Sequence, residues 1–221
     1  MTLPLVGEVG LGWIGVPLTF FWIVGLVNAI NFMDGIDGIT AGQVIVATLT
    51  WVVVGLLIGA GHVTVLSVLL AASSLGFLAH NWPPARVFMG DVGSAFLGYS
   101  LSILPLLMAP IPAWSAVTAV LAVWPFVVDA VFTFLRRLSR GENVLQAHRS
   151  HLYQRLVLAG FAQRSVTLLY IALAVVSGIL ALAWSAGALR RDQSVVVGAL
   201  LICVTLWSIV WKQERWAAAR H

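Results

Sequence analysis

Long apolar stretches separated by short polar segments organise this sequence. Crossing a bilayer as a helix takes about 20 apolar residues. Seven stretches are long enough or nearly so: 11–30, 43–60, 63–80, 94–109, 115–135, 165–184 and 194–211. None shows the strict polar–apolar alternation that is typical of a membrane β-barrel strand. The pattern predicts an all-α, polytopic transmembrane helix bundle of about seven spans, with residues 1–221 as a single membrane domain.

Composition excludes an ordinary soluble domain. Of the 221 residues, 61% are hydrophobic and 9% are charged, and the mean hydropathy is +1.00; soluble domains carry about 25% charged residues. The net charge of +4 could suggest a nucleic-acid partner. The basic residues, however, form short clusters between apolar stretches, as in membrane proteins. We therefore expect a lipid bilayer and no nucleic acid around this chain. The one cysteine, Cys203, allows no intramolecular disulfide.

The basic residues also predict the orientation of the chain. With seven spans, one face holds the segments 31–42, 81–93, 136–164 and the C-terminal tail. These segments carry ten Lys and Arg residues, against only Arg190 and Arg191 on the other face. The more basic face of a membrane protein is cytoplasmic. The acids and histidines of the three candidate elements described next all lie in these segments, which predicts one composite site facing the cytoplasm.

The first candidate element runs from Asn28 through Asn31 and Asp34 to Asp37, at the end of the first apolar stretch. Asn28 and Asn31 lie one helical turn apart and share a face. Glycines follow both acids and let the backbone approach a ligand closely. Such oxygen-rich side chains suit Mg²⁺ chelation or a polar substrate. The alternative is a solvated loop whose Asp and Asn side chains cap the next helix, but capping needs only one such residue.

The second candidate element is the segment from Asn81 to Ser94, which includes Asp91 between Gly90 and Gly93. Two prolines, at 83 and 84, favour an extended backbone. Asp91 and Ser94 could cap the following helix. Alternatively, an Asp flanked by glycines is suited to holding a divalent cation on a pyrophosphate. These residues alone leave both interpretations open.

The third candidate element contains His148, Arg149, His151 and Arg155. Two imidazoles at positions i and i+3 can share a helix face, and with the two arginines they form a surface suited to phosphates. Zinc is disfavoured, since no third ligand lies nearby. An amphipathic helix on anionic headgroups is the alternative. Separately, Asp129 lies within the fifth apolar stretch. An acid there is a functional candidate, or Arg136, seven residues on, could neutralise it; we expect the structural role.

Together the three elements resemble the polyprenyl-phosphate N-acetylhexosamine-1-phosphate transferases, glycosyltransferase family 4. That family includes the enzymes that start O-antigen synthesis and the phospho-MurNAc-pentapeptide translocase. The matching motifs are Asn28-x-x-Asn31-x-x-Asp34-Gly-x-Asp37-Gly, Phe88-Met-Gly-Asp91-x-Gly-Ser94 and His148-Arg-Ser-His151-Leu-Tyr-Gln-Arg155. The last motif is closer to the O-antigen-initiating branch than to the translocase.

The resemblance implies a reaction: undecaprenyl phosphate attacks the β-phosphorus of a UDP-N-acetylhexosamine, and UMP leaves. It implies a bacterial inner-membrane location, Mg²⁺ (or Mn²⁺) as cofactor, and Asp91 as the metal ligand. The implied catalytic residues are Asp34, Asp37, His148 and His151. The implied substrate-binding residues are Asn28, Asn31, Asn81, Arg149 and Arg155. A homodimer is left open.

Family members are typically longer, and they carry an Asp-Asp pair upstream of the first motif that this sequence does not contain. The alternative function is therefore a catalytically incomplete membrane paralogue or fragment that binds the lipid carrier or a partner.

Overall fold

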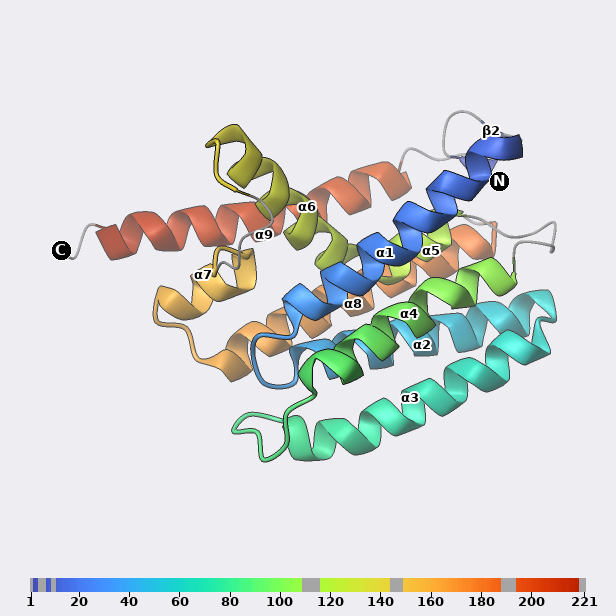
Figure 1. Cartoon of the computed structure of the whole chain (residues 1–221), viewed down its shortest axis with the longest axis horizontal. Helices are drawn as coiled ribbons and strands as arrows, with labels where there is room; N and C mark the ends of the chain where they lie inside the picture. The colour runs from blue at the N-terminus through green and yellow to red at the C-terminus, as the bar shows by residue number, and fades with distance from the viewer. Residues whose placement is uncertain are drawn as a thin grey trace.

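Helices make up nearly all of the chain that the computed structural model describes, namely residues 2–3, 7–8, 11–108, 116–143, 149–187 and 194–218 (Figure 1). They are α1 (Gly15–Met33), α2 (Ile39–Ile58), α3 (Gly61–Asn81), α4 (Gly90–Leu107), α5 (Ala116–Ala122), α6 (Trp124–Ser139), α7 (Leu152–Leu158), α8 (Gln163–Ser185) and α9 (Ser194–Ala218). A 3₁₀ turn, η1 (Gly12–Ile14), precedes α1. Extended structure in these ranges is limited to two paired strands, β1 (Thr2–Leu3) and β2 (Gly7–Glu8). The predicted all-α bundle is confirmed.

Five helical segments are long and apolar enough to cross a membrane: Gly12–Met33, Ile39–Ile58, Gly61–Asn81, Gly90–Leu107 and Gln163–Ser185. They coincide with five of the predicted stretches, so the chain is a multi-pass membrane protein. In α9 the shorter apolar segment is Val197–Lys212. The structure therefore supports five spans, or six if α5 and α6 form one. Seven stays a prediction.

The stretch 115–135, expected to form one continuous span, is bent by 82° between α5 and α6. Pro125 follows the break at the start of α6, and proline has no N–H with which to continue a helix. Carbonyl groups freed inside a membrane need other donors. Gln43 of α2 donates from Nε2 to the carbonyl of Ala122 at 3.1 Å, and Ser177 of α8 donates to that of Leu121. Neighbouring helices thus stabilise the break.

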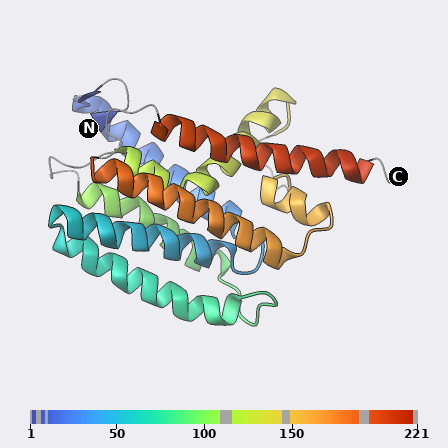
Figure 2. The same ribbon diagram turned by 180° about the vertical axis from the view of Figure 1, so that it is seen from behind.

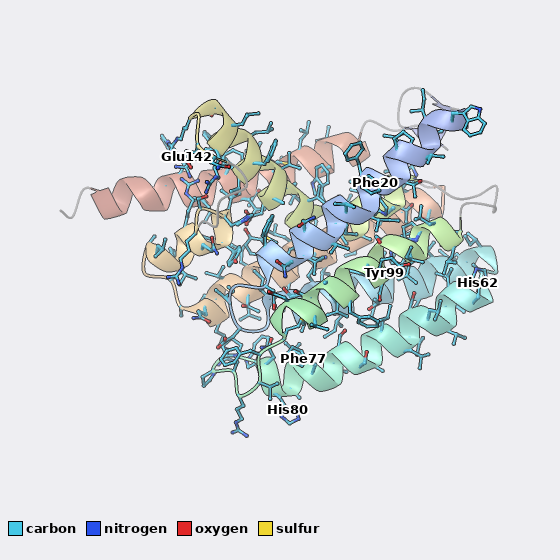
Figure 3. The ribbon with its side chains drawn as sticks, in the orientation of Figure 1. Phe20, His62, Phe77, His80, Tyr99 and Glu142 are labelled. Atoms are coloured by element: carbon cyan, nitrogen blue, oxygen red, sulfur yellow. The ribbon has the colours of Figure 1, made fainter. Side chains whose placement is uncertain are left out.

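Short connections bring the segments of interest to one end of the bundle. The α1–α2 loop, the α3–α4 loop, α7 and the start of α8 lie at the left in Figure 1 and at the right in Figure 2, where the bundle is seen from behind. His62 and His80 lie near opposite ends of α3, with His80 toward the end that holds these segments (Figure 3). The described parts of these segments therefore lie at the same end of the bundle, and the cytoplasmic orientation of that end stays a prediction.

Close packing of α1 against α4 sets the geometry at that end. A Cβ added to Gly98 of α4 would lie 2.8 Å from the Cα of Val27 of α1, so only glycine allows this approach. Trp22 of α1 donates from Nε1 to the carbonyl of Ser102 of α4 at 2.9 Å. Ile30 and Leu101 are buried in the core between them. The C-terminal turn of α1 is thereby held against the first turn of α4.

Candidate active site

Asn31 joins the first two predicted elements. Its Nδ2 donates to Asp91 Oδ1 at 3.3 Å and to Ser94 Oγ at 2.9 Å. Asp91 lies in the first turn of α4, where no side chain caps the helix; Ser94 Oγ instead donates to the carbonyl of Asp91 at 3.2 Å. The capping interpretation of Asp91 and Ser94 is therefore wrong. The two residues belong to a polar junction between the ends of α1 and α4.

Asp34 ends α1 and lies at the same junction. Its backbone N–H donates to the carbonyl of Asn31 at 3.2 Å. Burial raises the pKa of the Asp34 carboxyl, the Thr40 hydroxyl opposes that change, and the negative charge of Asp91 adds to it. The influence of Asp91 shows that the two carboxylates are close enough to repel each other. The junction thus gathers negative charge at the end of an apolar bundle.

Asp37 is held by the elements around it. Its Oδ2 accepts a hydrogen bond from the backbone N–H of Ala85 at 2.9 Å, which ties the α1–α2 loop to the α3–α4 loop. Its carbonyl accepts from Thr167 Oγ1 at 2.7 Å, and its N–H donates to Gln163 Oε1 at 3.3 Å; both partners belong to α8. The side chain therefore helps to fix the loop that carries Asp34.

Asn81 is buried, and both ends of its carboxamide make internal hydrogen bonds. Oδ1 accepts from the N–H of Gly38 at 2.9 Å, and Nδ2 donates to the carbonyl of Val87 at 2.8 Å. Gly38 has a φ of +76°, a left-handed conformation that favours glycine, and it begins α2 without a side-chain cap. Asn28 donates to the carbonyl of Val24 in its own helix. Substrate binding by Asn28 and Asn81 stays a prediction.

The third predicted element is α7 and the residues before it. His151 is the N-cap of α7, and its backbone N–H donates to Gln154 Oε1 at 3.2 Å. Arg149 is exposed, and Arg155 lies half-buried in the last turn of the helix. His148 lies outside the described residues, so its predicted role cannot be placed. His151 itself is only 3% exposed, which makes it a packed imidazole at the edge of the site.

Asp129, the acid within the bent pair of helices, contacts residues that the sequence did not indicate. Its carboxylate is fully buried and contacts His151, Tyr170 and the start of α7. The expected structural role agrees with these contacts, and pairing with Arg136 stays a prediction. Residues 22 and 41 positions away along the chain could not be identified from sequence spacing.

Tyr153 is a contributor that the sequence reasoning missed. Its hydroxyl donates to the carbonyl of Phe32 at 3.0 Å, beside the end of α1. A Cβ at Gly35 would collide with that hydroxyl. Burial raises the pKa of Tyr153, and the negative charges of Asp129 and Asp34 contribute. The tyrosine thus remains a neutral donor that packs α7 onto the loop carrying Asp34. Its position within the third motif was the sequence feature that could have indicated this role.

The donor set fits Mg²⁺ if the substrate supplies further ligands. In the ranges that the structure covers, no three His, Cys, Asp or Glu side chains group closely enough to hold a metal ion by themselves. Mg²⁺ commonly takes one or two carboxylates and completes its shell with water and phosphates. Asp91 and Asp34 offer two mutually repelling carboxylates, and Asn31 orients one of them. A cation bound between them would relieve this repulsion.

Residues 1–109 match the model of glycosyl transferase family 4. The chain is 40% identical over 164 residues to the probable undecaprenyl-phosphate N-acetylglucosaminyl 1-phosphate transferase of Bacillus subtilis, covering 73% of this chain and 46% of that protein. It is 36% identical over 175 residues to the phospho-N-acetylmuramoyl-pentapeptide-transferase of a Synechococcus species (75% and 48%). It is also 36% identical over 173 residues to the decaprenyl-phosphate N-acetylglucosaminephosphotransferase of Mycobacterium leprae (69% and 44%). The chain spans about half the length of these relatives.

Proposed function

We propose that this chain is a sugar-phosphate transferase of glycosyl transferase family 4, whose model residues 1–109 match. It transfers an N-acetylhexosamine-1-phosphate from a UDP-sugar to a polyprenyl phosphate such as undecaprenyl phosphate, and UMP is released. The product begins a cell-envelope polysaccharide, of which O-antigen is one example. Both the relatives' names and the site at the end of a membrane bundle support this reaction.

The observation that carries the proposal is the junction of Asn31, Asp34 and Asp91. It lies where apolar helices end, so a lipid phosphate can approach from the bilayer while a nucleotide approaches from water. Oxygen ligands gathered there suit a pyrophosphate with its counter-ion.

The reaction forms one bond and breaks one. An oxygen of the lipid phosphate bonds to the β-phosphorus of the UDP-sugar, and the bond between that phosphorus and the oxygen bridging to UMP breaks. Mg²⁺, when bound by Asp91 and Asp34, would neutralise the charge that develops on the pyrophosphate. Asn31 orients Asp91 through its hydrogen bond, and Asp37 fixes the loop that carries Asp34. Catalysis then rests on positioning and charge neutralisation.

The cationic residues complete the proposed site. Arg149 and Arg155 would supply positive charge and hydrogen-bond donors to the substrate phosphates. The role of His148, which lies outside the described residues, stays a prediction. The basic residues at this end of the bundle support a cytoplasmic site in a bacterial inner membrane. The carboxylates of the junction support Mg²⁺ dependence. A homodimer stays a prediction.

The test is UMP release by the protein reconstituted in lipid nanodiscs with undecaprenyl phosphate, Mg²⁺ and UDP-N-acetylglucosamine or its epimers. We expect UMP with at least one donor and at least a 100-fold lower rate for Asp91→Asn, the order of magnitude of a lost charge-stabilising group. The matched control is Glu142→Gln, which removes a half-exposed carboxylate on another part of the surface (Figure 3). Donor binding without UMP release would refute the transferase and favour the binding-only alternative.

A further inference from the structure

Asp129 makes five hydrogen bonds although it is completely buried. Oδ1 accepts from the N–H of Leu152 at 2.8 Å and from Thr133 Oγ1 at 3.2 Å, and it lies 3.0 Å from His151 Nδ1. Oδ2 accepts from Tyr170 Oη at 2.6 Å and from the N–H of Tyr153 at 3.1 Å. A buried carboxylate is costly unless it is fully hydrogen-bonded, and this one is surrounded by donors.

The donors around Asp129 indicate which ring nitrogen of His151 carries a hydrogen. Backbone N–H and hydroxyl donors bond both oxygens of Asp129, so its carboxyl acts as an acceptor. An acceptor at Oδ1 assigns a hydrogen to Nδ1 of His151, 3.0 Å away. A carboxylate that holds Nδ1–H in this way fixes both the tautomer and the rotation of an imidazole.

The imidazole lies beside the junction described above. Its ring centroid is 6.0 Å from that of Phe32, the residue after Asn31 on α1. The imidazole also stacks on Tyr153, at 6.0 Å between ring centroids, and the hydroxyl of that tyrosine donates to the carbonyl of Phe32. Asp129 of α6 and the end of α1 thus contact the same imidazole and the same helix, α7.

We propose that Asp129 is a positioning residue of the site, which orients the imidazole of His151 at the end of α1 and holds it in the Nδ1-protonated tautomer. The inference rests on the proposed transferase function for its effect on turnover. Its structural part, the state of His151, stands independently of turnover.

The first test observes His151 directly by NMR of ¹⁵N-histidine-labelled protein in nanodiscs, with the signal assigned by His151→Gln. In Asp129→Asn we expect the Nδ1-protonated signal of His151 to be lost or shifted. The matched control is Ser177→Ala, which removes another buried hydrogen bond, to Leu121, and leaves the His151 signal in place. Unchanged His151 signals in a folded Asp129→Asn variant would overturn the inference.

If Asp129→Asn does not fold, the Tyr170→Phe variant is used instead, because it removes one donor from the same carboxylate. A shifted His151 signal supports the inference and an unshifted one overturns it.

The second test uses turnover. Asp129→Asn should lower kcat about 10- to 100-fold, the range for groups that orient a functional imidazole. In a His151→Gln background the same substitution should add less than about two-fold, since residues acting through one another are not additive. Losses that simply multiply would refute action through His151. If the wild-type protein releases no UMP, the transferase proposal fails, while the NMR result still decides the orientation of His151.

Discussion

Gly35 lies where α7 packs on the loop that carries Asp34. Any Cβ at this position would collide with the hydroxyl of Tyr153 and approach Gln154 Nε2 to 3.4 Å. The tyrosine is buried and its hydroxyl is held by the carbonyl of Phe32. The tyrosine therefore cannot move aside easily. The glycine at position 35 allows α7 to pack closely against the α1–α2 loop.

We predict that Gly35→Ala displaces α7 from the loop. Overpacking of this kind costs about 1–3 kcal/mol, and UMP release should fall at least about 10-fold because the carboxylates move. Adding Tyr153→Phe, which removes the colliding hydroxyl, should restore part of the loss. The control is Gly25→Ala on α1, where a Cβ meets nothing within 4 Å. Equal activity of the Gly35→Ala variant and wild type would contradict the packing described.

Asp34 makes stability depend on pH. Its pKa is raised above the ordinary value of 3.8 by burial and by Asp91. A carboxyl with a raised folded-state pKa favours the folded state below its unfolded pKa, and this contribution is lost as pH rises through the folded pKa. Without metal, Asp34→Asn should therefore melt at a higher temperature than wild type at pH 7. The difference should shrink as the pH is lowered toward 3.8. A difference in melting temperature that grows as the pH is lowered would contradict this prediction.

At the scale of elements, the contact between α1 and α4 positions the polar junction. The two helices approach at Gly98, where an added Cβ would lie 2.8 Å from a backbone atom of α1. A backbone atom cannot move aside as a flexible side chain can. The Asn31–Asp91 hydrogen bond, about two turns further along, depends on this approach.

We predict that Gly98→Ala separates α1 from α4 and lowers UMP release about 10-fold or more, since small displacements of positioning groups are costly. The protein should remain in the membrane, because hydropathy hardly changes. Gly76→Ala is the matched control: this glycine lies within α3, and its added Cβ contacts nothing within 4 Å. If both variants turn over like wild type, the junction does not depend on the helix contact.

The break between α5 and α6 shows what hydropathy alone could not supply. The stretch 115–135 is long and apolar enough to predict one span. Pro125, which lies within it, was the sequence feature that could have indicated a break. The hydrogen bonds that stabilise the break come from Gln43 and Ser177 in distant helices. Such partners are determined by packing, which no local pattern in the sequence reports.

At the scale of the whole molecule, the length of the apolar stretches predicted the long helices. The side of the membrane assigned to each connecting segment predicted which elements lie near one another. Asn31, Asp34 and Asp91 were expected in one site and lie in one junction. The contacts of Asp129 with His151 and Tyr170 were not predicted, since they join residues far apart in sequence. Asn81 looked like a binding residue by its motif, while its buried contacts link two loops.

The orientation predicts which end of the bundle reaches the cytoplasm. In a Cys203→Ser background, His80→Cys should react with a membrane-impermeant maleimide only after permeabilisation, whereas His62→Cys should react in intact spheroplasts. Both positions are exposed, at opposite ends of α3 (Figure 3). The reverse labelling pattern would place the site on the outer face and contradict the charge argument.

The central claim is that the chain moves a sugar together with its phosphate. The most direct measurement uses a UDP-N-acetylhexosamine labelled with radioactive phosphorus at the β position, undecaprenyl phosphate and Mg²⁺ in nanodiscs. The account predicts that the label enters the lipid fraction as a pyrophosphate-linked sugar while the released UMP is unlabelled. Label that stays in the aqueous phase, with every donor offered, would contradict it.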